Sequence, residues 1–363
     1  MKYFRDLRLV SNNTHALKAL KSISSKTKPM CAIAIAVLGL SACGKSPDGN
    51  ANNSGLNLNL SKTSVSGLSS GGYMATQLQL SHSETIVGAG IIGAGPYYCA
   101  LGDIAIALGQ CVNKASHSIE NSPFIAQYET YVKEGLVAKP SSVSDDRVLL
   151  IHGKLDDTVN RTAADLLAQQ YRMWLPESQF RYVNDQDFGH HMPTVNEGSD
   201  CAVSEAPYLG NCNYDGAGEI LQHIYGKLNP PVEVKDNAAL KHIDLGELTD
   251  LSGTSISDEA FIFVPQTCAD GQTCSLHLSF HGCNQSSEFV QSAYAENAGF
   301  NRWAQSNSIV VLYPQIKKSM MMPLNPQGCW DWWGYTGENY ANKQGPQIRA
   351  MFEVIQALSS TND

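Results

Sequence analysis

A serine set between two glycines constrains this chain most. The pentapeptide Gly67–Gly71 has the pattern Gly-x-Ser-x-Gly with Ser69 at its centre. Residues 57–66 predict a strand before it, and Tyr73 to Leu80 carry apolar residues at helical spacing after it. A sharp strand-to-helix turn needs small residues where backbones crowd, and it exposes the central hydroxyl. The pattern predicts a nucleophile at Ser69, with an ordinary Gly/Ser turn as the alternative.

The order of the motifs narrows the fold class. In an ordinary α/β-hydrolase, a His-Gly segment after an early strand supplies one oxyanion-hole amide, and the serine elbow, the acid and the histidine follow. Here the elbow and the candidate acid and histidine lie in the first two-thirds, and His281-Gly282-Cys283 lies in the last third. This order is the one expected of a circularly permuted hydrolase, in which the original ends are joined and the chain begins at a different point.

The candidate acid follows a second strand-like run, Arg147 to His152. The residues after it match the pattern Gly-x-x-Asp-x-x-Val, which selects Asp156 as the group that would orient and stabilise a histidine. Asp157 is the rival, and a solvated loop carboxylate is the alternative for both.

The candidate base lies in the segment Phe188 to Thr194, which holds two adjacent histidines. Because adjacent side chains point in different directions, only one can face the serine. The Gly-His step favours His190 over His191 as the base. A surface or metal-binding histidine pair is the alternative. No third ligand stands at helical or hairpin spacing, so we expect neither a metal nor a cofactor.

Two backbone amides are expected to form an oxyanion hole, those of Ser70 after the nucleophile and Cys283 after the His-Gly step. Near Cys329 the sequence holds a cluster of aromatic residues suited to an acyl chain or a polyester strand. We expect about half of these rings to pack in the core instead. The aromatic candidates are Trp330, Trp332, Trp333 and Tyr335.

Strand-like and helical segments alternate, which predicts an α/β fold with a mostly parallel sheet and helices on both faces. One catalytic domain over residues 57–363 is the simplest organisation. Residues 232–258 have weak periodicity and are expected to connect two halves. The other expected strands are 86–94, 180–183, 260–264, 275–280 and 309–313, and the other expected helices are 122–136, 163–175, 214–228, 289–305 and 347–358.

The first 43 residues predict export. Lysines precede an apolar run from Met30 to Leu40 that is too short to span a bilayer, and Leu40-Ser-Ala-Cys43 resembles a bacterial lipoprotein cleavage box. We expect cleavage before Cys43 and lipidation on it, followed by a flexible tether over residues 44–56. The expected location is the cell envelope, at the outer membrane or the cell surface. A secreted or periplasmic protein with an ordinary signal is the alternative, and Met30 is an alternative start.

The charge balance excludes one class of partner. The formal net charge is −9, and it falls to −15 without residues 1–43, which hold seven Lys or Arg and one Asp. An acidic protein lacks the clustered cations that nucleic acid needs, so an uncharged substrate fits better.

We expect a monomer that meets the membrane only through its lipid anchor.

Eight cysteines follow the export segment, and an even number in an exported chain predicts disulfides. Sequence alone leaves 105 complete pairings for eight cysteines. Nearness in sequence suggests Cys99–Cys111, Cys201–Cys212 and Cys268–Cys274, which leaves Cys283–Cys329. None of the spacings is Cys-x-x-Cys, so a zinc site is not expected.

Several segments together resemble the poly(3-hydroxybutyrate) depolymerases of the single-domain, circularly permuted type. They are VSGLSSGGYMATQ, GAGPYYCA, IHGKLDDTV, GHHMPT, LHLSFHGCNQ, IVVLYPQ and NPQGCWDWWGYTG, and the resemblance spans roughly residues 60–357. It implies a circularly permuted α/β-hydrolase fold and a hydroxyalkanoate ester substrate, polymer or oligomer.

The resemblance also assigns roles to residues. It places nucleophile, acid and base on Ser69, Asp156 and His190, and the oxyanion amides on Ser70 and Cys283. It further implies one tryptophan near the substrate, with Trp330 and Trp333 ranked together. The permutation implies that Leu358 lies near Asn57.

Two other functions remain open at this stage. One is an esterase for aromatic or acetylated plant esters, such as feruloyl esters, whose relatives share the His-Gly-Cys and tryptophan features. The other is a non-catalytic surface lipoprotein that binds polymer on a hydrolase scaffold. A lipid anchor would favour oligomers or amorphous polymer over distant solid granules.

Overall fold

The computed structural model describes residues 56–112, 119–234 and 239–359, which belong to one compact unit of the chain. The predicted export segment with Cys43 and residues 44–55 of the predicted tether lie outside the described residues.

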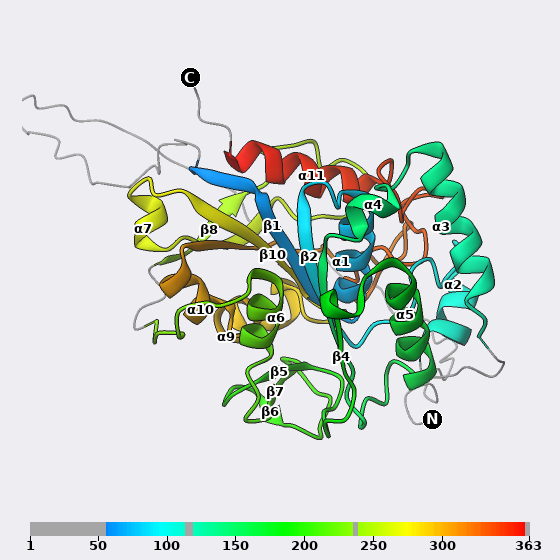
Figure 1. The fold of residues 1–363 in the computed structure, drawn as a ribbon, viewed down its shortest axis with the longest axis horizontal. Coiled ribbons are helices and arrows are strands. Elements are labelled where there is room, and N and C mark those ends of the chain that lie inside the picture. The colour runs from blue at the N-terminus through cyan, green and yellow to red at the C-terminus, as the bar shows by residue number, and fades with distance from the viewer. Residues whose placement is uncertain (1–55, 113–118, 235–238, 360–363) are drawn as a thin grey trace, which may run out of the picture. The chain divides into compact units, whose positions relative to one another are not determined.

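The described fold is built around an eight-stranded sheet with the order β4-β3-β2-β1-β10-β11-β9-β8 (Figure 1). Neighbouring strands from β4 to β11 run parallel, and β9 and β8 continue the sheet antiparallel at one edge. The expected mostly parallel sheet is therefore confirmed. The strands are β1 (Leu58–Leu68), β2 (Ile86–Ile92), β3 (Arg147–Ile151), β4 (Phe180–Val183), β8 (Leu240–Asp244), β9 (Glu259–Phe263), β10 (Cys274–Phe280) and β11 (Ile309–Tyr313).

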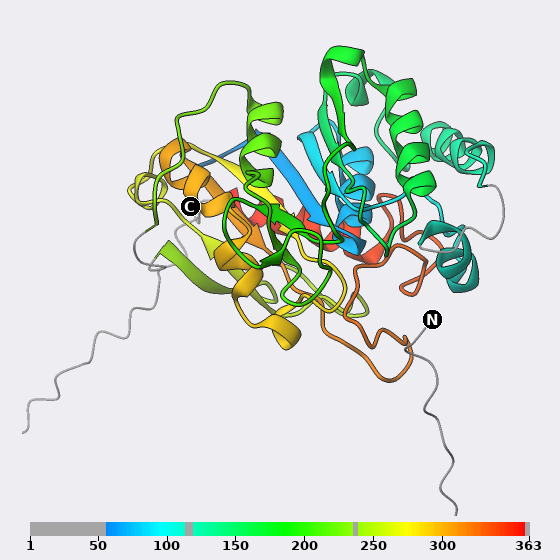
Figure 2. The same cartoon turned by 90° about the horizontal axis from the view of Figure 1, so that it is seen from below.

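Helices cover both faces of this sheet, as a buried parallel sheet requires. In Figure 1, α11 (Pro346–Ser359) lies above the sheet, and α6 (Gly216–Tyr225) and α10 (Phe300–Asn307) lie below it; Figure 2 gives the same layers from below. With α11 lie α1 (Ser70–Ser81), α3 (Ser122–Glu134) and α5 (Arg161–Trp174). Shorter elements are α2 (Ile104–Ile106), a π-helical turn (Ala107–Cys111), α4 (Pro140–Val143), a 3₁₀ turn (Glu177–Gln179), α7 (Gln266–Ala269), α8 (Ser287–Val290) and α9 (Ala293–Asn297).

Alternating side chains of the strands divide the core into two parts, one on each face. In β11, Val310 and Leu312 join the core beneath α1 and α11. Val311 and Tyr313 of the same strand join the core beneath α6 and α10. Successive side chains of a strand point to opposite faces, so a strand buried on both faces must be apolar throughout.

Three sequence expectations differ from the structure. The helix expected over 289–305 is divided into α8, α9 and α10, because Gln291 (φ 54°) and Gly299 (φ 93°) leave the helical region. Residues 232–258, expected as a connection, contain the edge strand β8. A separate three-stranded parallel sheet, with the order β5-β7-β6, was not expected. Its strands are Met192–Thr194, Leu209–Asn211 and Ser199–Asp200.

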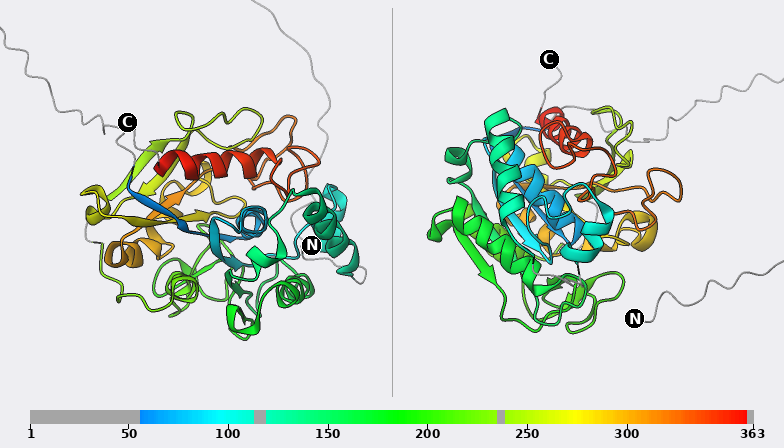
Figure 3. Two further views of the ribbon diagram at one scale, coloured as in Figure 1. Left: turned by 45° about the horizontal axis from the view of Figure 1, so that its top comes forward. Right: turned by 90° about the vertical axis from the view of Figure 1, so that its right-hand side faces the viewer.

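The two ends of the described fold lie side by side (Figure 3). The Leu56 amide donates to the Leu358 carbonyl at 3.1 Å, where β1 begins and α11 ends. This agrees with the expectation that Leu358 lies near Asn57.

The four disulfides suggested by sequence nearness are all present in the structure. The bonds are Cys99–Cys111, Cys201–Cys212, Cys268–Cys274 and Cys283–Cys329. Three of them close short local loops, and the fourth joins segments that are 46 residues apart.

Candidate active site

Ser69 lies at the sharp turn between β1 and α1, with φ 57° and ψ −121°. Of the residues from Thr63 to Ser83, Ser69 is the one that is not buried. Its amide donates to the Ile92 carbonyl at the end of β2, at 2.8 Å. A positive φ with ψ near −120° is strained for a serine, and strain of this kind is typical of functional turns.

The glycines on either side of Ser69 are required by close backbone contacts. A Cβ at Gly67 would lie 2.2 Å from the Gly71 carbonyl oxygen, and a Cβ at Gly71 would lie 2.2 Å from the Phe280 carbonyl oxygen. Neither position can accept a side chain without moving backbone. The pentapeptide is therefore packed directly against the end of β10, as an ordinary surface turn would not be.

Asp156 and His190 are brought together by the loops that follow β3 and β4. These two strands are parallel neighbours, and the loops continue side by side, since the Leu155 amide donates to the Phe188 carbonyl at 3.0 Å. His190 Nδ1 lies 2.8 Å from Asp156 Oδ2. Both side chains are almost fully buried, at 7% and 1% exposure.

Both oxygens of the Asp156 carboxylate take part in hydrogen bonds. Its Oδ1 accepts hydrogen bonds from the amides of Thr158 and Val159, each at 2.9 Å. Burial alone would raise the pKa of Asp156, but the charge and hydrogen bond of His190, with the amide of Val159, outweigh it and lower the pKa. The carboxyl is thus ionised at neutral pH.

The rival residues lie elsewhere. Asp157 is exposed, and within the described residues its Oδ1 accepts a single hydrogen bond, from the neighbouring Thr158 hydroxyl at 3.4 Å. The His191 ring is directed to the Cys201 carbonyl, with Nε2 at 2.7 Å from that oxygen. The geometry pairs Asp156 with His190, which are the register and the histidine that the sequence pattern selected.

Gly93 lies beside this pair, next in sequence to the residue that bonds the Ser69 amide. A Cβ at Gly93 would lie 3.0 Å from His190 Nδ1 and 3.1 Å from Asp156 Oδ2, and Gly93 directly follows Ile92, which accepts from the Ser69 amide. Among the described residues, the Ser69 side chain makes no hydrogen bond. Sequence reasoning did not single out Gly93, although the glycine at the end of a buried strand was the available signal.

His152 is a second histidine beside the acid and was not predicted as a site residue. Its Nδ1 lies 3.7 Å from Asp156 Oδ2, and its side chain is 1% exposed. Burial lowers the pKa of His152, so it is neutral at neutral pH. The neutral His152 ring therefore lies directly beside the Asp156 carboxylate.

Ser70 and Cys283 follow the ends of two adjacent parallel strands. Gly67 in β1 pairs with Phe280 in β10, and the two strands are parallel. The segments that follow these strands therefore leave the sheet at the same edge. Ser70 begins α1, and the first amides of a helix have no partner within it. In the described part of the chain, the Cys283 amide also makes no hydrogen bond.

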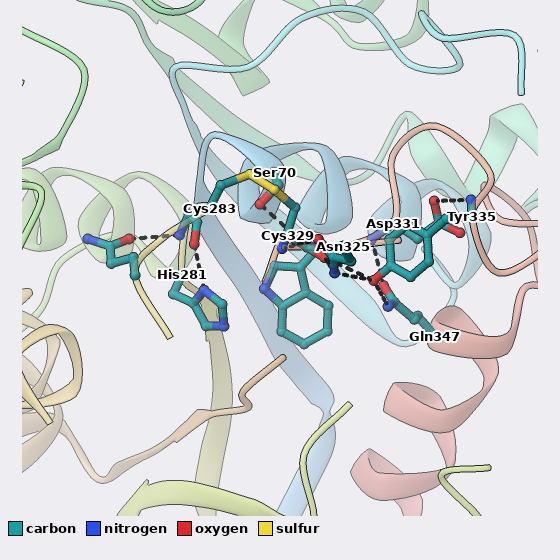
Figure 4. Close-up of a disulfide and its surroundings, with 11 residues drawn as sticks. Ser70, His281, Cys283, Asn325, Cys329, Asp331, Tyr335 and Gln347 are labelled. Atoms are coloured by element: carbon teal, nitrogen blue, oxygen red, sulfur yellow. Dashed lines mark hydrogen bonds between the residues drawn. A yellow bond between two sulfur atoms is a disulfide. The ribbon is translucent and has the colours of Figure 1, made fainter. Parts of the chain in front are cut away.

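The disulfide Cys283–Cys329 ties this strand end to the tryptophan segment (Figure 4). The Trp330 amide donates to Ser70 Oγ at 3.3 Å. The Asp331 carboxylate then accepts from the amides of Gly334, Tyr335 and Thr336, at 2.7, 3.0 and 2.8 Å. A buried aspartate therefore shapes the loop that carries the aromatic side chains.

The four aromatic candidates occupy different environments. Trp330 is fully buried and packs on Phe280, and Trp332 is 6% exposed and stacks on Tyr73. Trp333 and Tyr335 are partly exposed, and their ring centroids lie 4.8 Å apart. The division between core and surface rings is close to the expected half.

The long disulfide should contribute more stability than a short one. Replacing Cys283 and Cys329 together by alanine should lower the free energy of unfolding by about 4 kcal/mol, since the bond closes a long loop. The matched change at Cys268 and Cys274, whose sequence separation is 6, should cost about 2 kcal/mol. Guanidinium unfolding of both variants tests this. Equal losses would contradict an entropic origin of the difference.

Among the described residues, His191, Cys201 and Cys212 place potential ligand atoms within 4.8 Å of one another, but the two sulfurs form a disulfide and offer no thiolate. No helix within residues 56–112, 119–234 and 239–359 is long and apolar enough to cross a bilayer.

The chain is similar to known polyester-degrading enzymes. It is 37% identical over 311 residues to a poly(3-hydroxybutyrate) depolymerase of Delftia acidovorans, with 84% of this chain covered, and it spans 61% of that protein's length. It is 32% identical over 319 residues to a polyhydroxybutyrate depolymerase of Talaromyces funiculosus, covering 84% of this chain and 91% of that protein.

Solved structures give the same relationship. The crystal structure of a PHB depolymerase from Penicillium funiculosum matches with a TM-score of 0.79 and 30% identity, covering 85% of this chain and 99% of that chain. A PHB depolymerase variant in complex with an R3HB trimer matches equally well. No family model matches the chain.

Proposed function

Because the chain belongs to the family of poly(3-hydroxybutyrate) depolymerases, we propose that it is a serine hydrolase of 3-hydroxybutyrate esters. The observation that carries this proposal is the buried hydrogen bond between Asp156 and His190 at the sheet edge where Ser69 is partly exposed. A nucleophile, a base and an acid on the ends of separate parallel strands are the parts that acyl transfer needs.

We assign the base to His190 and the acid to Asp156. An ionised carboxylate can only accept a hydrogen bond, so His190 Nδ1 carries the proton and donates it to Asp156. The other nitrogen, Nε2, then has a lone pair available for the Ser69 proton. Asp156 fixes this tautomer and stabilises the imidazolium that forms.

The reaction proceeds through an acyl-enzyme. Ser69 Oγ attacks the ester carbonyl carbon while its proton passes to His190 Nε2. The tetrahedral intermediate collapses, the carbon–oxygen bond to the leaving alcohol breaks, and His190 protonates that oxygen. Water then attacks the Ser69 ester by the same steps, releasing the 3-hydroxyacid and restoring Ser69.

We assign the stabilisation of the oxyanion to the amides of Ser70 and Cys283. Both lack protein partners among the described residues, and both lie at the ends of adjacent strands. The start of α1 adds the positive end of a helix dipole. Each such donor is worth about 10²–10³-fold in kcat.

The partly exposed rings of Trp333 and Tyr335 are our candidates for contact with the substrate. Trp330 is fully buried, so its role is to support the loop. A relative was solved with an R3HB trimer. We propose that short 3-hydroxybutyrate chains lie against the partly exposed rings of Trp333 and Tyr335 in this chain.

The same geometry supports a circular permutation. In the usual hydrolase order the His-Gly strand precedes the serine elbow. Here β10 follows in sequence but lies beside β1, and the end of α11 meets the start of β1 through Leu358 and Leu56. If these ends were joined and the chain were opened before β10, the His-Gly strand would precede the serine elbow, as it does in the usual order.

A comparison of three ester classes tests the proposed function. Purified protein would be incubated with amorphous poly(3-hydroxybutyrate), soluble 3-hydroxybutyrate oligomers and methyl ferulate, and acid release would be followed by chromatography. We expect 3-hydroxybutyrate units from the first two. Cleavage of ferulate alone would support the aromatic esterase, and no cleavage of any substrate would favour a binding scaffold.

We also propose that Cys43 is lipidated and anchors the enzyme to the cell envelope. The motif Leu40-Ser-Ala-Cys43 after an apolar run supports it. Replacing Cys43 by serine should move the protein from the membrane pellet to the soluble fraction. Cys31→Ser, which alters a cysteine inside the apolar run, is the control and should stay in the pellet. Unchanged fractionation of Cys43→Ser would refute lipidation.

A further inference from the structure

The side chain of His281 has no role in the catalytic scheme above, although it directly precedes the oxyanion segment. It follows the last residue of β10 and is fully buried. Both ring nitrogens contact backbone. Nδ1 lies 2.7 Å from the Gly282 carbonyl oxygen, the contact drawn from the His281 ring in Figure 4. Nε2 lies 3.2 Å from the Ile316 amide nitrogen.

The Ile316 amide fixes the tautomer of His281. A backbone N–H can only donate, so Nε2 must be the accepting nitrogen and Nδ1 must carry the proton. Burial lowers the pKa of His281 to about 4, which keeps the ring neutral at neutral pH. The Nδ1 proton is therefore donated to the Gly282 carbonyl.

That hydrogen bond fixes the direction of the next amide. The Gly282 carbonyl and the Cys283 N–H belong to one planar peptide group, and in a trans peptide they point in opposite directions. The bond between Gly282 and Cys283 is not among the cis peptides of the chain. Holding the carbonyl against His281 turns the Cys283 N–H to the opposite side, where it has no protein partner in the described residues.

Gln285 holds the preceding peptide in the same way. Its Oε1 accepts from the Gly282 amide at 2.7 Å, and its Nε2 donates to the Pro207 and Tyr208 carbonyls at 2.8 and 3.1 Å. The Gly282 amide is thus satisfied within the protein. Of the two successive amides, only that of Cys283 remains to meet a developing negative charge.

We propose that His281 is a positioning residue that aims the Cys283 amide at the oxyanion of the transition state. This inference rests on the proposed serine-hydrolase mechanism and extends it. His281 does not touch the substrate, and it acts through the Gly282 carbonyl. An amide turned away from the oxyanion loses most of its value to catalysis, while ground-state binding of the ester is unaffected.

The test compares three variants with p-nitrophenyl butyrate as substrate. His281→Leu removes the donor, whereas His281→Asn keeps an N–H close to the position of Nδ1. The matched control is His277→Leu, which removes a fully buried neutral histidine within β10 that contacts Ser64 and Ser66 and not the oxyanion segment. Thermal unfolding is measured for each variant.

We expect His281→Leu to lower kcat by about 30- to 100-fold with KM within about threefold of wild type. Its inhibition constant for 1-butaneboronic acid, which forms a tetrahedral adduct on the serine, should rise by a similar factor. His281→Asn should keep more than about a tenth of the wild-type kcat, and His277→Leu should keep kcat within about threefold.

Three outcomes would overturn the inference. They are a kcat of His281→Leu near wild type, a rise in KM in place of the loss in kcat, and an equal loss in His277→Leu. If His281→Leu does not fold, His281→Asn decides alone, and a folded protein with less than about a tenth of the wild-type kcat contradicts the inference. Failure of the mechanism itself is separate, because Ser69→Ala would then retain turnover.

Discussion

Replacing Ser69 by alanine should abolish ester hydrolysis while leaving the fold intact. Removing the nucleophile of a serine hydrolase lowers kcat by about 10⁶-fold, and the remaining groups cannot replace the attacking oxygen. Turnover of p-nitrophenyl butyrate measures the loss. Because the partly exposed Ser69 side chain makes no hydrogen bond within the described structure, the melting temperature should change little.

Ser61→Ala is the matched control for this variant. Ser61 is an exposed serine of the same strand, β1, so its loss should leave kcat within about twofold of wild type. Turnover by Ser69→Ala above about a thousandth of the wild-type rate would assign the nucleophile to another residue.

Replacing Asp156 by asparagine should lower kcat by about 10⁴-fold. The asparagine amide would present an N–H where His190 Nδ1 now donates, which favours the opposite tautomer and removes the lone pair that faces the serine. Asp157→Asn is a matched control one residue away. Asp157 is exposed, so its variant should stay within about threefold of wild type, and the reverse result would reassign the acid.

Because the pKa of Asp156 is lowered in the folded state, the contribution of this carboxyl to the free energy of unfolding should change with pH in a defined direction. A carboxyl whose pKa is lower in the folded than in the unfolded state stabilises the fold above its unfolded pKa. That contribution is lost as the pH falls through the folded pKa. The difference in unfolding free energy between wild type and Asp156→Asn, measured by urea denaturation, should therefore shrink between neutral and strongly acidic pH. A difference that grows on acidification would contradict the direction of the shift.

Local patterns were enough to predict the principal strands and the residues that they present. Strands such as β3 and β11 are short apolar runs bounded by glycine or polar residues, and a run of this kind buried on both faces has few alternatives. The spacing after β3 selected Asp156 over Asp157 through the pattern Gly-x-x-Asp-x-x-Val. The elbow at Ser69 was visible because its glycines are required sterically.

Other features depend on contacts that no local pattern carries. Gly93 and His152 lie on separate strand ends and meet Asp156 and His190 only through the order of the sheet. The burial of Trp330 could not be separated from the partial exposure of Trp333, because both lie in one aromatic run. The break at Gln291 reflects a residue with positive φ, which helix propensity does not reveal.

Trapping the acyl-enzyme tests the central claim most directly. The p-nitrophenyl ester of 3-hydroxybutyrate is activated, so acylation should outpace deacylation and the intermediate should accumulate. The protein would be quenched in acid during turnover and its peptides mapped by mass spectrometry. We expect a hydroxybutyryl group on Ser69 that is absent from Ser69→Ala. Turnover with an adduct on a different residue, or continued turnover by Ser69→Ala, would contradict it.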